Sequence, residues 1–282
     1  MGRLNKKKVE LLGSHISYWE RNPDIDDVLI IIHGFGGNHL ALTPMSKHLS
    51  SFRVIMIDLP GFGESTSMRV HHSFVNYEKL LEQFCNKLGI ATFNLWGHSY
   101  GATICIGFAR ITKLKIKNLI LVSPAFPDAS RYSKAGVIYY RIASMSPEYF
   151  QRKMLANPRI SRMTGQRLLM EVSENRREQL LQNGERDLKF FNSKVVNEVF
   201  LDFYKLKNNK ELEFINLRTL IIGGDKDILV PIEYLKHLKL RFSNSRLIEI
   251  QGQGHLSPLE RPGHLAKLTS EFILDTSENS SK

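Results

Sequence analysis

Residues 92–111 carry the clearest evidence for the fold and read TFNLWGHSYGATICIGFARI. Its first part, Thr92–Trp96, is an apolar run typical of a buried strand, and its last part, Tyr100–Ile111, has apolar residues at helical spacing. Between them Gly97-His98-Ser99-Tyr100-Gly101 fits the pattern G-x-S-x-G, in which the glycines permit a tight strand-to-helix turn. Such a turn projects the serine hydroxyl from the edge of the sheet, so Ser99 is the candidate nucleophile.

Short apolar runs and helical patterns alternate on both sides of this stretch. The alternation predicts an α/β protein with a mostly parallel central sheet and helices on both faces. An opening pair of strands is expected at Lys8–Leu12 and His15–Trp19. The strands expected after that pair are Val28–Ile32, Arg53–Ile57, Thr92–Trp96, Leu119–Ser123, Thr219–Gly223 and Leu247–Ile250. The expected helices are Ser73–Leu88, Tyr100–Ile111, Ile232–Leu240 and Pro262–Leu274.

The alternation stops between residues 126 and 210, where helix-like segments are separated by prolines and glycines. Strand–helix order resumes afterwards, whereas two separate domains would not leave a fragment of sheet behind the helices. We therefore predict one α/β core formed by residues 1–125 and 211–275, with residues 126–210 inserted as a helical cap, or lid. The polar residues 276–282 are predicted to be a flexible tail.

A serine hydroxyl needs a base to become a nucleophile, and the base needs a group that orients it. The chain carries Asp225 and Asp227 after the last but one predicted strand, and His255 after the last strand. The carboxyl ends of these strands are expected at the same edge of the sheet as the Ser99 turn. Asp227 is the preferred acid because it precedes Pro231 by four residues, the usual spacing for this group, and Asp225 is the alternative.

A third candidate segment follows the buried strand Val28–Ile32 and reads His33-Gly34-Phe35-Gly36-Gly37. Attack on a carbonyl group creates an oxyanion, which preorganised N–H donors stabilise. The backbone amides of Phe35 and Tyr100 are the expected donors, and both residues are expected to contact the substrate. The segment fits neither phosphate-binding motif, G-x-G-x-x-G or G-x-x-x-x-G-K-[ST], and no metal-type cluster is found in the sequence. No cofactor and no metal ion are therefore expected.

Four other histidines are given no chemical role. His33 and His98 flank the candidate site in sequence and are expected to support it through structural hydrogen bonds and packing. His71 and His72 are expected to be exposed loop residues.

Taken together, these motifs resemble the α/β-hydrolase-fold family of serine hydrolases with a helical cap, over nearly the whole chain. Residues 58–65, DLPGFGES, are similar to the family's D-x-x-G-x-G-x-S loop, and Gly254-His255 is followed by Glu260, Arg261 and Pro262. The resemblance implies that nucleophile, acid and base fall on Ser99, Asp227 and His255. A serine at the elbow argues against the haloalkane dehalogenase and epoxide hydrolase members, which use aspartate there.

The predicted function is hydrolysis of a carboxylic ester through an acyl-enzyme, in an esterase- or lipase-like reaction. Residues 126–210 hold 11 of the 27 aromatic residues, which favours an apolar or medium-length acyl substrate. The same machinery serves carbon–carbon bond hydrolases, lactonases and thioesterases, and some members of the fold are ligand-binding receptors without turnover. These functions are the alternatives.

The net charge of +11 would suit a nucleic-acid or membrane partner. Residues 1–125 carry a net +5, residues 126–210 a net +7 and residues 211–282 a net −1. The chain lacks helix-turn-helix, zinc and RNP-type patterns, so no nucleic acid is expected. The excess on the predicted cap is either a solvated helical surface or the basis of weak peripheral contact with an anionic membrane. No obligatory protein partner is predicted.

The location predicted from the sequence is the cytoplasm. No apolar run approaches the roughly 18 residues of a membrane-spanning helix. The basic start of the chain is not followed by the apolar core of a signal peptide. Cys85 and Cys105 fall in helical, half-apolar patterns and are expected to be buried thiols, which suits a reducing compartment.

Overall fold

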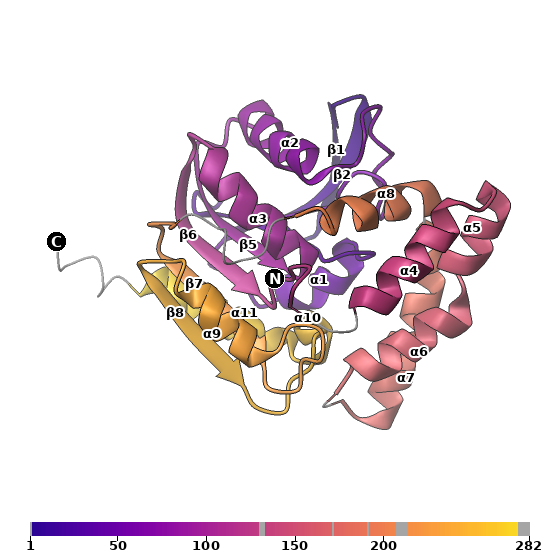
Figure 1. The fold of residues 1–282 in the computed structure, drawn as a ribbon. Coiled ribbons are helices and arrows are strands. Elements are labelled where there is room, and N and C mark those ends of the chain that lie inside the picture. The colour runs from indigo at the N-terminus through magenta and orange to yellow at the C-terminus, as the bar shows by residue number, and fades with distance from the viewer. Residues whose placement is uncertain (1, 130–132, 171, 191, 207–213, 276–282) are drawn as a thin grey trace.

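The computed structural model describes residues 2–129, 133–170, 172–190, 192–206 and 214–275. An eight-stranded sheet runs through the molecule in the spatial order β1-β2-β4-β3-β5-β6-β7-β8 (Figure 1). The strands are β1 (Asn5–Leu11), β2 (Ser14–Arg21), β3 (Val28–Ile32), β4 (Arg53–Ile57), β5 (Thr92–His98), β6 (Lys115–Val122), β7 (Thr219–Gly224) and β8 (Ser245–Ile250).

The sheet is mostly parallel, as predicted. Among these strands the β1–β2 and β2–β4 pairs are antiparallel, and β4, β3, β5, β6, β7 and β8 pair in parallel. The predicted strands Val28–Ile32 and Arg53–Ile57 match β3 and β4 residue for residue. Because all six parallel strands run the same way, their carboxyl ends form one edge of the sheet, and the loops that follow them meet there.

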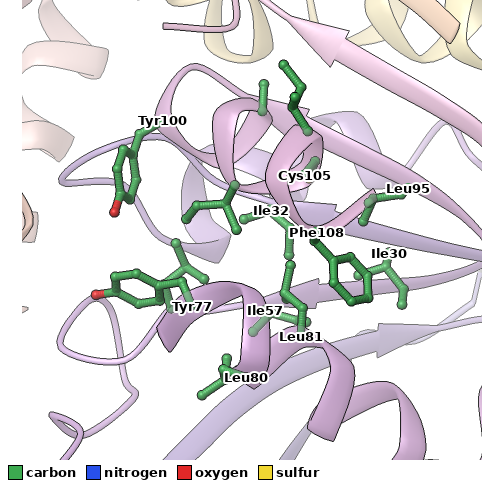
Figure 2. Close-up of a cluster of buried hydrophobic side chains, with 14 of the residues drawn as sticks. Ile30, Ile32, Ile57, Tyr77, Leu80, Leu81, Leu95, Tyr100, Cys105 and Phe108 are labelled. Carbon is green, nitrogen blue, oxygen red and sulfur yellow. The ribbon is translucent and has the colours of Figure 1, made fainter. Parts of the chain in front are cut away.

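Helices cover both faces of the sheet, also as predicted. Side chains alternate along a strand, so Ile30 and Ile32 of β3 point to one face while Leu29 and Ile31 point to the other. On the first face pack α2 (Phe74–Lys87), α3 (Tyr100–Ile111) and α9 (Ile232–Lys239). Figure 2 shows the strand side chains of this face meeting Leu81 of α2 and Phe108 of α3. On the second face pack α1 (His39–Ser46) and α11 (Pro262–Leu274), which α10 (Ser257–Glu260) precedes.

A group of helices occupies the chain between β6 and β7, and we call it the insertion. Its members are α4 (Ser133–Ser144), α5 (Glu148–Leu155), α6 (Pro158–Leu168), α7 (Glu174–Asp187), the 3-10 turn η1 (Leu188–Phe190) and α8 (Ser193–Phe203). In Figure 1 the insertion lies beside the sheet, with α8 nearest to the core and α4 and α5 farther out. The predicted tail 276–282, and residues 130–132, 171, 191 and 207–210 of the predicted cap, lie outside the described residues.

The structure adds two core helices that the sequence patterns did not indicate, α1 and the short α10. Helix α1 contains Pro44, which breaks the usual helical signal, and its N-cap is Asn38, whose side chain accepts a hydrogen bond from the Leu40 amide at 2.8 Å. The thiols of Cys85 and Cys105 are free and buried, as expected.

Candidate active site

Ser99 lies in the turn between β5 and α3, with φ of 52° and ψ of −120°. A positive φ is strained for a residue with a side chain, so the surroundings must hold it. The Ser99 amide donates to the carbonyl oxygen of Val122 at 2.9 Å. A Cβ atom on Gly97 would lie 2.6 Å from the Cα of Ala102, and one on Gly101 would overlap the backbone at the end of β3. The turn therefore requires both glycines of the motif.

The structure brings Ser99, His255 and Asp227 together from three separate loops at the carboxyl edge of the sheet. Ser99 Oγ lies 2.9 Å from Nε2 of His255, and Nδ1 of His255 lies 2.8 Å from Oδ2 of Asp227. Ser99 is 7% exposed, and His255 and Asp227 are each 4% exposed. In this geometry His255 can accept the Ser99 proton at Nε2 while Nδ1–H donates to the carboxylate.

The structure also shows which of the two candidate acids, Asp225 or Asp227, contacts His255. Asp227 accepts hydrogen bonds from the amides of Leu229 and Val230, both at 2.9 Å, through the oxygen that does not face His255. Burial raises the pKa of the Asp227 carboxyl, but the charge of His255 and the hydrogen bonds from His255 and the Val230 amide outweigh burial and hold the pKa below its usual range. Asp225 instead lies 3.6 Å from the ammonium group of Lys226. Asp227 is therefore the acid that contacts the histidine.

The loop after β3 approaches the elbow closely. A Cβ atom on Gly34 would lie 3.2 Å from Cβ of Ser99, so the backbone that leads into Phe35 passes next to the candidate nucleophile. The ring centres of Phe35 and Tyr100 lie 6.3 Å apart. The Tyr100 ring is buried and packs among Phe74 and Tyr77, the second of which lies beside it in Figure 2.

Two buried histidines hold the loops that carry these residues. His33 donates from Nδ1 to the Gly34 carbonyl oxygen at 2.7 Å and accepts at Nε2 from the Leu59 amide at 3.0 Å. His98 donates from Nε2 to the carbonyl oxygen of His255 at 2.8 Å. Burial, together with the nearby His255, lowers the pKa of His98 to about 3, so His98 stays neutral and keeps this hydrogen bond. Both histidines therefore act on the backbone of the site, as the sequence suggested.

Comparison with known proteins places the chain in a family. A family model described as "alpha/beta hydrolase fold" matches residues 27–262. The chain belongs to the alpha/beta hydrolase fold family. Its curated relatives include Lipase 1 of Psychrobacter immobilis, 23% identical over 264 residues that cover 88% of this chain and 77% of the relative. Monoacylglycerol lipase ABHD6 of Mus musculus is 24% identical over 264 residues, covering 90% of this chain and 77% of the relative. These similarities support a hydrolase activity at a coarse level.

Solved structures give the same fold. An esterase (EaEST) from Exiguobacterium antarcticum superposes with a TM-score of 0.79 at 17% sequence identity, and the match covers 97% of this chain and 99% of that one. At this identity the likeness establishes the architecture of the alpha/beta hydrolase fold alone.

In this member of the alpha/beta hydrolase fold family, aromatic side chains of the insertion lie next to the loop after β3. The ring of Tyr140 on α4 stacks on Phe200 of α8, with ring centres 3.6 Å apart. The centres of these two rings lie 6.1 and 5.9 Å, respectively, from that of Phe35. Phe203 of α8 lies 5.9 Å from Tyr100. The insertion therefore supplies apolar surface beside the elbow.

Glu260 links the insertion to the histidine loop, a role that the sequence did not reveal. Its Oε2 accepts from Nε2 of Gln253 at 2.7 Å and from the Gly254 amide at 3.4 Å. Burial raises the pKa of Glu260, and hydrogen bonds from the amides of Gly254 and of Met170 in the insertion oppose this rise. A Cβ atom on Gly254 would lie 2.7 Å from Cγ of Met170, so the insertion packs directly on the residue before His255.

A second link joins α8 to the start of α2, and here one expectation from the sequence was wrong. His72, predicted to be exposed, is only 3% exposed. It accepts from the Met68 amide at 3.0 Å, and its Nδ1 donates to Glu198 of α8 at 2.9 Å. The next acid on α8, Asp202, accepts from the Phe74 amide at 2.7 Å. Glu198 is 126 residues away in sequence, so no local pattern could have indicated this pair. His71 is exposed, as expected.

The described residues show neither a metal site nor a membrane span. No group of three or more His, Cys, Asp or Glu side chains among them could hold a metal ion. Within the same part of the chain, no helix has the length and apolar character needed to cross a membrane.

Proposed function

We propose that the protein is a serine hydrolase that cleaves a carboxylic ester through an acyl-enzyme. The observation that carries the proposal is the hydrogen-bonded chain from Ser99 through His255 to Asp227, which begins at a strained turn directly after a strand. Nucleophile, base and orienting acid in this order are what acyl transfer to a serine requires.

In the proposed reaction, Ser99 Oγ attacks the ester carbonyl carbon while Nε2 of His255 takes the hydroxyl proton. Asp227 holds the imidazole in the Nδ1–H tautomer and stabilises the imidazolium that forms. The backbone amides of Phe35 and Tyr100 are proposed to donate to the oxyanion, because the loop of one passes close to Ser99 and the other opens helix α3.

The second half of the reaction reverses these roles. His255 returns the proton to the leaving alcohol as the tetrahedral intermediate collapses to the acyl-enzyme. Water then attacks the acyl carbon with His255 as its base, which releases the carboxylic acid and restores the Ser99 hydroxyl.

The acyl part of the substrate is proposed to be apolar and of medium length, with residues 126–210 acting as a cap over the site. Phe35, Tyr140 and Phe200 form an aromatic group beside the elbow, and two of its three rings belong to the insertion. The curated relatives named above are lipases, which is consistent with such a substrate. An apolar surface favours an acyl chain over a polar group because it offers no partners for buried polar atoms.

Ester turnover of Ser99→Ala tests the proposal. On p-nitrophenyl esters of increasing acyl length we expect the wild-type protein to show turnover with a maximum at medium length, and Ser99→Ala to lose at least about 10³-fold. Ser51→Ala, at an exposed position just before β4 and so at the amino edge of the sheet, opposite the site, is the matched control and should keep full activity. Equal turnover by Ser99→Ala and wild type would contradict the mechanism.

The same screen, extended to thioesters and lactones, separates the alternative functions. Preference for thioesters or lactones over the p-nitrophenyl esters would assign the triad to one of the related hydrolases. Reaction of Ser99 with a fluorophosphonate, without turnover of any ester, thioester or lactone, would indicate a ligand-binding protein instead.

A further inference from the structure

Helix α4 has apolar residues on two opposite faces. On its inner face the Tyr140 ring stacks on Phe200 of α8. Ile138, Ile142 and Met145 follow one another at spacings of four and three residues, so they form one stripe on the side of the helix away from Tyr140. These three residues are 60%, 54% and 86% exposed. Exposure of this size means that no described part of the chain covers the outer stripe.

The exposed apolar surface continues onto the first turn of α5. Tyr149 and Phe150 are 65% and 55% exposed, and their rings contact each other edge to face at 5.5 Å. We call the five residues Ile138, Ile142, Met145, Tyr149 and Phe150 the α4–α5 surface. In Figure 1, α5 lies at the outer side of the insertion, and α4 runs from beside the core out to it. Single exposed apolar residues are normal, whereas clusters of exposed apolar residues are typical of interaction surfaces.

Basic side chains surround the α4–α5 surface. Residues 138–168 carry six basic residues and a single acidic one, Glu148. Arg162 is paired with two glutamates of α7. The other five are exposed, and the structure gives them no carboxylate partner within its described residues: Arg141, Arg152, Lys153, Arg159 and Arg167. The ammonium group of Lys153 lies 4.8 Å from the centre of the Tyr149 ring, which places a positive charge directly on the apolar surface.

We propose that the α4–α5 surface docks on an anionic lipid bilayer. Isoleucine, methionine and aromatic side chains are suited to the boundary between head groups and acyl chains, and the neighbouring basic residues are suited to anionic head groups. A second copy of the chain is a poorer partner, because a symmetric contact through this surface would bring two sets of positive charges together.

The position of the surface relative to the candidate site follows from α4 itself. The inner face of the helix reaches the loop after β3, where the Tyr140 and Phe35 ring centres are 6.1 Å apart. The docking face is on the opposite side of a cylinder about 10–12 Å across. In a docked molecule, the aromatic group of Phe35, Tyr140 and Phe200 would therefore lie close to the lipid layer. Docking does not depend on the proposed hydrolase function, because it is measured without substrate.

Sedimentation of the full chain with vesicles tests the proposal. We expect strong binding to vesicles that contain phosphatidylserine in phosphatidylcholine, and at least about tenfold weaker binding to pure phosphatidylcholine. The double variant Ile142→Asp/Met145→Asp should bind the anionic vesicles at least about tenfold less, and Arg152→Gln/Lys153→Gln should lose affinity and salt dependence together. The control is Leu240→Asp, which places a negative charge on the surface of the α/β core, outside the insertion. Leu240 is 68% exposed, and this variant should bind like wild type.

Three results would overturn the proposal. The first is absence of binding to anionic vesicles, and the second is equal binding to anionic and neutral vesicles. The third is unchanged binding by the Ile142→Asp/Met145→Asp variant, which would place the contact elsewhere. Because all the substituted side chains are exposed, each variant is expected to keep the wild-type circular dichroism spectrum and melting temperature, and that measurement accompanies the binding assay. The ester assay reports separately on the candidate active site, so the two proposals can fail independently.

Discussion

Key side chains are buried at the carboxyl edge of the sheet and exposed at the outer end of the insertion. At the sheet edge, Ser99, Asp227 and His255 are buried, and hydrogen bonds between separate loops fix them. At the outer end, Ile142 and Met145 are more than half exposed, and no described element covers them. The first arrangement suits chemistry, since reacting groups must be held within a fraction of an ångström. The second suits contact with something outside the chain.

Between these extremes, the inner side of the insertion shares the character of the core. Tyr140 and Phe200 stack on each other and approach Phe35. Glu260 and Glu198 tie the insertion to the histidine loop and to the start of α2. One group of helices thus has a fixed inner side facing the site and an open outer side. Substitutions in each region test this division.

The largest effect is expected at the core, from Asp227→Asn. The amide keeps the size of the side chain but offers His255 the wrong hydrogen-bonding partner, so the imidazole tautomer changes. In serine proteases with this triad the same change lowers kcat about 10⁴-fold, and we expect a loss of about 10³- to 10⁴-fold here. The control is Asp225→Asn, because Asp225 pairs with Lys226 and leaves the contact with His255 to Asp227. Ester kinetics on both variants measure the difference, and similar losses in the two would contradict the assignment of the acid.

A pH-dependent effect on stability is expected from Glu78 in the core. Glu78 is 7% exposed, and burial raises its pKa to about 7 while Arg110 opposes the rise. Between its ordinary pKa near 4.5 and about 7, the folded state binds more protons than the unfolded state, so stability falls as the pH rises through this window. Glu78→Gln should remove this fall, which amounts to about 3 kcal/mol at most.

Glu178, on the exposed side of α7, is the matched control for Glu78. Its hydrogen bond with Arg162 lowers its pKa, and it is open to solvent. We expect Glu178→Gln to leave the dependence of stability on pH between 4.5 and about 7 unchanged. Urea unfolding at several pH values measures both variants. A wild-type dependence that persists in Glu78→Gln would show that another group is responsible.

The smallest effect is expected from the two faces of the insertion. Phe200→Ala opens space on the inner side, so we expect the preferred acyl length to shift and kcat/KM for the original best ester to fall about tenfold. Phe150→Ala removes a similar ring from the outer side and should leave the acyl-length profile of soluble esters unchanged. A series of p-nitrophenyl esters measures both variants. The same shift in acyl-length preference in both variants would contradict the view that only the inner side of the insertion contacts the substrate.

Much of the core could be predicted from the sequence because its signals are local. The strands Val28–Ile32 and Arg53–Ile57 and the helix Tyr100–Ile111 were predicted to the residue, since a buried parallel strand is a continuous apolar run and the G-x-S-x-G turn marks where the helix begins. The order of strands then placed Ser99, Asp227 and His255 at one edge. The structure adds the distances between them, and their catalytic roles are a proposal.

The features that sequence reasoning missed depend on partners far along the chain. His72 was expected to be an exposed loop residue, but it is buried and hydrogen-bonded to Glu198, 126 residues later. The contact of Glu260 with Met170 likewise joins α10 to the segment after α6, which only the fold brings together. The outer stripe of α4 has the same periodicity as a buried one, so only the structure shows that Met145 is exposed.

Covalent modification by a fluorophosphonate tests most directly whether Ser99, His255 and Asp227 act together. The site and the rate of the modification are measured. We predict that one equivalent reacts with Ser99, as located by mass spectrometry of the digested protein. The reaction should be absent in Ser99→Ala and slowed at least about 10²-fold in Asp227→Asn, because the nucleophile depends on an oriented histidine. Modification at another residue, or an unchanged rate in Asp227→Asn, would contradict the claim that Ser99, His255 and Asp227 act as one unit.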